Sequence, residues 1–199
     1  RQTQIERANR LAPLSDTEWK QVISFLNTGT VFERAKNLRD LFPVKFDDGS
    51  SKHIFFLSDD PSKNIYQVTN QITIDHRDYN GRTSRFDVTL LVNGLPLVQI
   101  ELKKRGMEIA EAFNQTQRYI REAYWAGQGL FGFIQLFVIS NGANTRYYSN
   151  GTTGIEFAFP WADVHNKHIN EIVDFAEAFF NQQHLSLIHI SEPTRQEAI

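Results

Sequence analysis

The spacing of hydrophobic residues along the chain predicts two helices near its beginning. Ser15 is placed to cap the first helix, and Glu18 follows three residues later, as a capping box requires. Apolar residues then recur at helical intervals until Gly29, where this helix is expected to end. The stretch 31–41 has the same periodicity and Pro43 comes just after it, so a second helix is predicted there.

From about residue 53 the hydrophobic period changes to that of strands. Strands are predicted over residues 54–57, 66–74, 85–92 and 97–103. The last two are joined through Asn93-Gly94, a dipeptide typical of tight hairpin turns. The polar stretch 75–84 carries charges of both signs and is predicted to be an exposed loop.

The second half of the chain mixes helical and strand patterns. A helix is predicted over 108–125, a strand over 133–140, a short strand over 145–149 and a last helix over 166–180. Residues 186–199 do not match what precedes them and resemble translated cloning-vector sequence, with an ordinary C-terminal tail as the alternative. The folded domain is therefore expected to span residues 1–185.

Composition narrows the class of protein. The chain has 199 residues, of which 41% are hydrophobic, so a folded globular protein is expected rather than a disordered one. It contains no Cys, which excludes disulfides and thiolate metal sites and favours a reducing cytoplasm. No apolar run approaches the roughly 20 residues that a membrane-spanning helix needs. The chain begins at Arg1 without a signal-peptide pattern, so we expect a piece of a longer cytoplasmic protein.

Charged residues converge near the ends of the two hairpin strands. Side chains alternate across a strand, so Glu101 and Lys103 share one face, about 7 Å apart. Asp87 lies on the charged face of the preceding strand. Two carboxylates can hold Mg²⁺, which prefers oxygen ligands, and a lysine beside them can position a water or stabilise developing negative charge. For these three residues taken alone, a solvated strand face with Glu and Lys is the more common interpretation.

The hairpin register sets a condition on this site. If Asn93-Gly94 were a plain two-residue loop, Asp87 would lie opposite Ile100 and on the wrong face for Glu101. A three-residue loop or a bulge would restore the match. We therefore predict that the hairpin is not a simple two-residue one.

The surroundings of the hairpin favour contact with nucleic acid, although the net charge of −2 does not. Lys104 and Arg105 form a small basic cluster suited to phosphate. Gln115 and Tyr119 are four residues apart and so share one face of the next helix; a surface Gln beside a half-buried Tyr is the alternative. Other arginines could line a DNA groove or be solvated loop charges, namely Arg77, Arg82 and Arg85.

These residues carry a family resemblance. Residues 85–106 read RFDVTLLVNGLPLVQIELKKRG, and they resemble the nuclease region of the restriction (R) subunit of type I restriction-modification enzymes. The segments EAFNQTQRY at 111–119 and FVISNG at 137–142 continue the resemblance, which is clear over about 66–149. It implies an α/β fold of the PD-(D/E)xK type, with a restriction-endonuclease-like core in which a central mixed sheet is flanked by helices.

The resemblance also implies roles for individual residues. Asp87 and Glu101 would bind Mg²⁺, or Mn²⁺ in its place, and Lys103 would complete the catalytic set. Gln115 and Tyr119 match a Gln-x-x-x-Tyr element that holds DNA or supports the site in a subset of such nucleases. The Pro that often precedes the family's Asp is replaced here by Phe86.

Two parts of the family pattern are missing. An acidic residue on an N-terminal helix often completes the metal site; Glu33 is a candidate by element order, and a residue before Arg1 is the alternative. There is no G-x-x-x-x-G-K-[ST], so the ATP-driven motor of such subunits would lie outside this chain.

The resemblance implies a domain that hydrolyses double-stranded DNA in company with methyltransferase and specificity subunits. The alternative from a different class is a non-catalytic nuclease-like module that docks to DNA or to those subunits.

Overall fold

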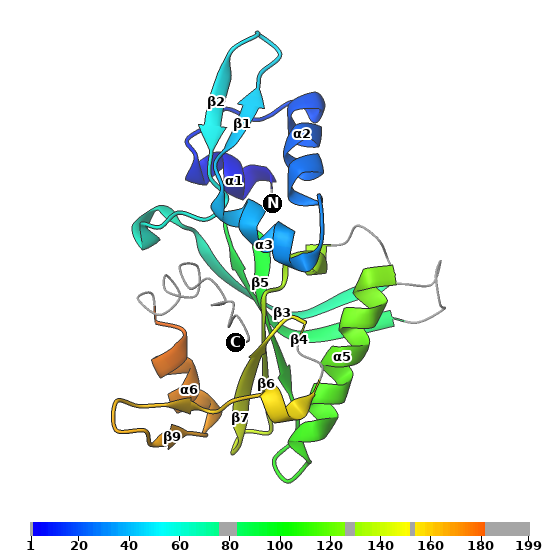
Figure 1. The fold of residues 1–199 in the computed structure, drawn as a ribbon, viewed down its shortest axis with the longest axis vertical. Coiled ribbons are helices and arrows are strands. Elements are labelled where there is room, and N and C mark those ends of the chain that lie inside the picture. Colours follow the sequence, from blue (N-terminus) through cyan, green and yellow to red (C-terminus); the bar gives the residue numbers. More distant parts are fainter. Residues whose placement is uncertain (1, 76–82, 126–129, 152–153, 182–199) are drawn as a thin grey trace, which may run out of the picture.

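The computed structural model describes residues 2–75, 83–125, 130–151 and 154–181 (Figure 1). Its α-helices are α1 (Gln2–Ala8), α2 (Asp16–Leu26), α3 (Val31–Arg39), α5 (Ile109–Trp125) and α6 (Ile172–Phe179). Its strands are β1 (Phe42–Lys45), β2 (Ser51–Ile54), β3 (Tyr66–Asp75), β4 (Thr83–Val92), β5 (Leu95–Leu102), β6 (Leu136–Ser140), β7 (Thr145–Ser149), β8 (Trp161–Ala162) and β9 (His168–Ile169). Three short 3₁₀ helices complete it, η1 (Pro61–Lys63), η2 (Leu130–Phe133) and η3 (Ile155–Phe157).

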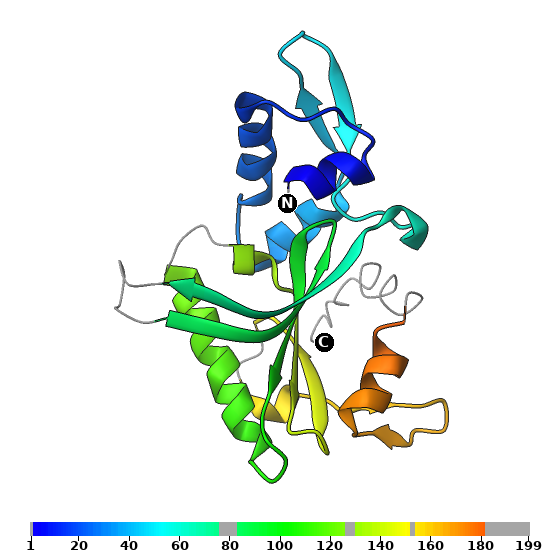
Figure 2. The same cartoon turned by 180° about the vertical axis from the view of Figure 1, so that it is seen from behind.

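A five-stranded mixed sheet forms the centre of the fold, with the strand order β3-β4-β5-β6-β7. Neighbouring strands are antiparallel except for β5 and β6, which are parallel. A parallel pair needs a long crossover, and α5 lies in the segment between these two strands. In Figures 1 and 2 the sheet stands between α5 and α6, so helices flank it on both sides. This confirms the predicted α/β class and the central mixed sheet.

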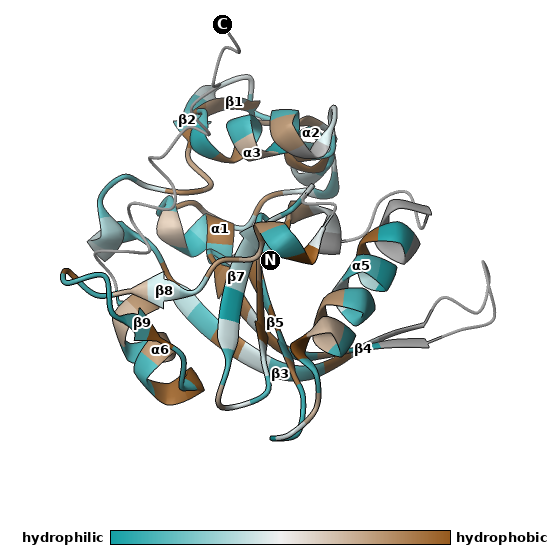
Figure 3. Ribbon diagram, turned by 60° about the horizontal axis from the view of Figure 1, so that its bottom comes forward, coloured by the Kyte–Doolittle hydropathy of each residue, from teal (hydrophilic) through white to brown (hydrophobic). Residues whose placement is uncertain are grey.

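The two faces of the sheet bury two separate clusters of apolar side chains. On the α5 face, Phe113 of the helix packs with Phe137 and Ile139 of β6 and with Tyr148 of β7. The other face is covered by α6 and the N-terminal elements, which pack on residues that include Val92, Val98, Ile100 and Val138. β5 is apolar along most of its length in the middle of the fold (Figure 3) because both of its faces are covered.

Most predicted elements are present, with shifted ends. The capping box at Ser15 and Glu18 is confirmed at the start of α2. The strand predicted from Phe133 begins later, because Phe133 closes the 3₁₀ turn η2 before β6. The helix predicted from Asn166 is also shorter, because its first residues form the β8–β9 hairpin.

Some elements had no usable sequence signal, and some predictions lie outside the described residues. α1 and β1 are too short to show a period, and both were missed. Most of the predicted loop 75–84 and the whole tail 186–199 fall outside the ranges that the structure describes. None of the helices in those ranges is long and apolar enough to cross a membrane.

The hairpin turn is fastened to the rest of the fold by the buried side chain of Asn93. Its Oδ1 accepts from the Ile65 backbone at 2.8 Å, and its Nδ2 donates to Phe56 O at 2.7 Å and to Asn64 Oδ1 at 2.9 Å. The backbone of Asn93 is left-handed, with φ 51°, which Asn tolerates better than most residues. Asn93 therefore fixes both the shape of the turn and its place against the N-terminal elements.

Replacing Asn93 by Gly should lower the free energy of unfolding by about 2–4 kcal/mol. Glycine accepts the positive φ, so the loss isolates the buried hydrogen bonds, whose unsatisfied partners cost about 1–3 kcal/mol each. Urea unfolding followed by circular dichroism measures the change. Asn150→Ala is the control, because the Asn150 side chain makes one such bond, to Ile134 O at 2.7 Å. Equal losses in the two variants would contradict this account.

Candidate active site

The register of β4 and β5 decides whether the two acidic residues can meet. The turn is a plain two-residue one, with Val92 paired to Leu95 and both Asn93 and Gly94 at positive φ. Of the two predicted alternatives, the three-residue loop is therefore wrong and the bulge is confirmed. The extra residue is Leu97, which is skipped between the pair Leu91–Pro96 and the pair Leu90–Val98.

The bulge at Leu97 supplies the one-residue shift that the turn itself does not. Val88 pairs with Ile100, so the next position along β4, Asp87, lies opposite Glu101. The required condition, an extra residue somewhere in the hairpin, is confirmed, and its location is corrected.

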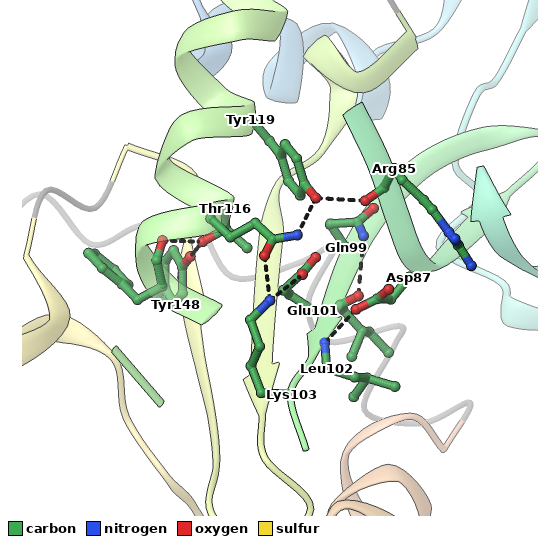
Figure 4. A network of polar contacts seen from close by, with 12 residues as sticks. Arg85, Asp87, Gln99, Glu101, Leu102, Lys103, Thr116, Tyr119 and Tyr148 are labelled. Atoms are coloured by element: carbon green, nitrogen blue, oxygen red, sulfur yellow. Dashed lines mark hydrogen bonds and ion pairs between the residues drawn. The ribbon is translucent and has the colours of Figure 1, made fainter. Parts of the chain in front are cut away.

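Asp87 and Glu101 bring two carboxylates together at the edge of the cluster under α5 (Figure 4). Asp87 Oδ2 accepts from the Leu102 backbone N–H at 2.9 Å, which ties the acid to β5. The Glu101 side chain is 1% exposed, and its Oε2 is buried without a hydrogen-bond partner. A buried carboxylate oxygen without a donor is an acceptor that a cation could use.

The pKa of Glu101 is raised from 4.5 to about 7, chiefly by burial and then by the charge of Asp87. Lys103 opposes both effects through its hydrogen bond and its charge. Two carboxylates that disfavour each other's charge in this way are stabilised together by a divalent cation.

A chain of hydrogen bonds joins Glu101 to α5 and back to β4 (Figure 4). Lys103 Nζ donates to Glu101 Oε1 at 3.1 Å and also to Gln115 Oε1. Gln115 donates from Nε2 to Tyr119 OH, and that hydroxyl donates to Arg85 O at 2.6 Å. Four side chains that the sequence singled out, from the end of β5 and from α5, are thus connected to one another and to the Arg85 carbonyl of β4.

The alternation of β4 is interrupted at Asp87, which sequence reasoning did not anticipate. Strand alternation predicts that Phe86 shares a face with Val88, but Phe86 packs with Tyr119 of α5, with ring centroids 4.5 Å apart. The register of β3 and β4 skips the pair Gln71 and Asp87, and Gln71 has a left-handed backbone with φ 52°. A local irregularity at Gln71 and Asp87 therefore changes the direction of the side chains at Asp87, a common role for irregularities beside functional sites.

The other predicted basic residues are exposed or lie outside the described residues. Lys104 and Arg105 are exposed, and Arg105 makes an ion pair with Glu171, 2.9 Å between Nη2 and Oε2. Arg85 is exposed, whereas Arg77 and Arg82 are outside the described residues. A role for any of these cations in DNA binding stays a prediction.

Glu33 does not join the site. Its Oε2 accepts from the Thr30 backbone N–H at 2.7 Å in the capping box of α3, and this contact lowers the pKa of the Glu33 carboxyl. Within the described ranges no three His, Asp or Glu side chains are grouped so as to hold a metal ion. Element order alone could not reveal that Glu33 caps its own helix.

Two buried polar pairs beside the site were missed. Thr116 of α5 bonds Tyr148 of β7 through their hydroxyls, which anchors the helix to the sheet. Thr89 of β4 donates to Gln99 of β5 at 2.8 Å. The signal for the second pair was present, because alternation places Thr89 with Asp87 and Gln99 with Glu101 in strands that are otherwise apolar.

A mixed sheet flanked by helices, with two carboxylates and a lysine on adjoining strand ends, defines a restriction-endonuclease-like core. The chain belongs to the family described as type I restriction enzyme R protein N terminus, whose model matches residues 1–154.

Two named relatives support this family membership. The chain is 44% identical over 177 residues to the type I restriction enzyme SsaAORF53P endonuclease subunit of Staphylococcus saprophyticus, covering 87% of this chain and 18% of the relative. It is 38% identical over 191 residues to the type I restriction enzyme EcoprrI endonuclease subunit of Escherichia coli, covering 92% of this chain and 60% of that protein. The chain thus spans about a fifth of the length of the staphylococcal relative.

Proposed function

We propose that this chain is the nuclease domain of a type I restriction enzyme R subunit and hydrolyses phosphodiester bonds of double-stranded DNA with the help of Mg²⁺. The observation that supports this most directly is the meeting of the Asp87 and Glu101 carboxylates beside Lys103. The family membership makes DNA the substrate to test first.

The donor set suits Mg²⁺ better than a softer metal. Asp87 and Glu101 offer carboxylate oxygens, and Glu101 Oε2 has no competing donor. Mg²⁺ is commonly held by one or two carboxylates, with waters and substrate phosphate completing its shell, so the lack of a third acid among the described residues is no obstacle. Mn²⁺, with similar oxygen preference, would serve as a substitute. When bound, the metal would lower the pKa of a coordinated water and offset charge on the phosphate.

The protein side chains would position the reactants. Lys103, only 16% exposed at its side chain, is held by Glu101 and Gln115 so that its charge stays at the site, where it can orient the attacking water or stabilise negative charge on the phosphate. Gln115 and Tyr119 would fix Lys103 relative to β4 and could also touch the DNA backbone. Lys104 and Arg105 would meet phosphates further along the duplex.

The activity of the whole protein is proposed on the same grounds. We propose that ATP-driven motor domains lie elsewhere in the subunit, and that methyltransferase and specificity subunits complete a cytoplasmic restriction complex. Sequence recognition would then belong to those partners, and this domain would cut without reading bases.

Divalent metal binding separates the catalytic proposal from a non-catalytic docking module. The wild-type chain should bind Mn²⁺ in calorimetry, and Glu101→Ala should weaken that binding by about a hundredfold or more, because one of two carboxylate ligands is lost. Glu111→Ala, on the exposed side of α5, is the control and should bind as the wild type does. A wild-type chain without measurable Mn²⁺ affinity would favour the docking module.

A further inference from the structure

A fully buried polar pair, Thr89 and Gln99, lies next to the two carboxylates along β4 and β5. Thr89 and Gln99 are both 0% exposed, and Thr89 Oγ1 donates to Gln99 Oε1 at 2.8 Å across β4 and β5. Each lies two residues along its strand from an acid, Thr89 from Asp87 and Gln99 from Glu101. Buried polar side chains in a sheet call for a reason, since an apolar pair would avoid the cost of their desolvation.

The reason lies in the competing register. Without the bulge at Leu97, the pairing that starts with Val92 and Leu95 at the two-residue turn would continue without a shift along both strands. Thr89 would then lie opposite Val98, and Gln99 would lie opposite Val88. Asp87 would face Ile100, and the two carboxylates would be separated. These strands could pair in two ways that differ by one residue. The structure has the bulged pairing, and only that one brings the acids together.

The polar pair distinguishes these registers where the apolar residues cannot. Leu90 and Val98, the first pair after the bulge, make non-directional contacts that Leu90 could equally make with a neighbouring apolar residue. The Thr89–Gln99 hydrogen bond exists in the bulged register alone, and its loss would leave a hydroxyl and an amide buried without each other. A buried polar residue that fixes register is an established device in other folds.

We infer that Thr89 and Gln99 are positioning residues whose hydrogen bond selects the bulged register and thereby places Asp87 opposite Glu101. This inference rests on the proposed metal site for its functional consequence, but not for its structural one. The pair touches neither metal nor substrate; it acts through the pairing of β4 with β5.

Two replacements at one position test this. Thr89→Val keeps the shape of the side chain and removes the hydroxyl, whereas Thr89→Ser keeps the hydroxyl. We expect Thr89→Val to weaken Mn²⁺ binding by about tenfold or more and Thr89→Ser to stay within about threefold of the wild type, both measured by calorimetry where the proteins are fully folded. Nuclear Overhauser effects between the backbones of Val88 and Ile100 report the register directly, and they should weaken in Thr89→Val alone.

The double variant Thr89→Val, Gln99→Leu separates register from stability. Both polar groups are gone, so its unfolding midpoint should recover relative to Thr89→Val, while Mn²⁺ affinity and the Val88–Ile100 signals should not. The control is Thr145→Val, which removes another buried hydroxyl, bonded to Ser140 Oγ at 2.8 Å in the next hairpin, and should leave both readouts unchanged.

The inference would be overturned if Thr89→Val kept the register signals and the Mn²⁺ affinity of the wild type. It would also be overturned if Thr89→Ser lost as much Mn²⁺ affinity as Thr89→Val. If the double variant does not fold, the comparison of valine with serine still decides. If the wild type itself binds no Mn²⁺, the proposed function fails while the register signals continue to test the positioning role.

Discussion

The full-length R subunit carrying Asp87→Asn, assembled with its partner subunits, should lose DNA cleavage by about a hundredfold or more while its ATP hydrolysis continues. Asparagine keeps the size of the side chain and an oxygen for the Leu102 N–H, but it removes the negative charge that would hold the cation. The motor is proposed to lie outside this chain, so its turnover should not depend on Asp87. Plasmid linearisation and phosphate release, followed in the same reaction, measure the two activities.

The matched control for that experiment is Asp174→Asn, an exposed acid on α6, the helix that flanks the sheet on the side opposite α5. It should cut and hydrolyse ATP as the wild type does. Retained cleavage in Asp87→Asn would remove Asp87 from the active site. Parallel loss of cleavage and ATP hydrolysis would indicate failed assembly instead, which gel filtration of the complex distinguishes.

In the absence of metal, Glu101→Gln should make this chain more stable than the wild type at pH 8, by up to about 3 kcal/mol, since a tenfold change in proton affinity corresponds to about 1.4 kcal/mol. The pKa of Glu101 is raised from 4.5 to about 7 in the folded protein, chiefly by burial. The folded state therefore binds its proton more tightly than the unfolded chain does. The stability that protonated Glu101 contributes is fully present below pH 4.5 and is lost as the pH rises through about 7. A neutral amide removes this dependence.

Urea unfolding with EDTA at pH 5 and at pH 8 measures the effect. Glu33→Gln is the control of opposite sign: the pKa of Glu33 is lowered by its Thr30 contacts, so its carboxylate adds stability that is lost on acidification. Saturating Mn²⁺ should cancel the advantage of Glu101→Gln at pH 8, because the cation stabilises the wild-type carboxylates. The raised pKa would be contradicted if the stability difference between the wild type and Glu101→Gln were the same at pH 8 as at pH 5.

The elements that sequence predicted well are those whose signal is local. The capping box of α2 depends on Ser15 and Glu18 alone, three residues apart. β6 is apolar on both faces and α5 carries a long amphipathic period, so neither needs a partner to be recognised. α1, β1 and the β8–β9 hairpin are too short for a period to emerge, and their formation depends on what they pack against.

The site divides in the same way. The residues Glu101 and Lys103 share a strand face by alternation, and Gln115 and Tyr119 share a helix face by spacing, so the sequence by itself determined these pairs. Whether Asp87 joined them depended on the pairing of two strands, which the sequence left open between two registers. The tertiary structure decided it through the bulge at Leu97.

The order of residues is therefore enough to show which strand and helix faces carry charge, whereas which of those faces meet depends on the folded chain. Local periodicity is a property of a few consecutive residues, whereas the bulge depends on contacts between residues far apart in the chain. Asn93 holds the turn against the N-terminal elements, and Thr89 bonds Gln99 across the sheet. Glu33 is the opposite case, in which a local contact decides. Its carboxylate caps its own helix, so the acid expected from element order does not lie beside Asp87 and Glu101.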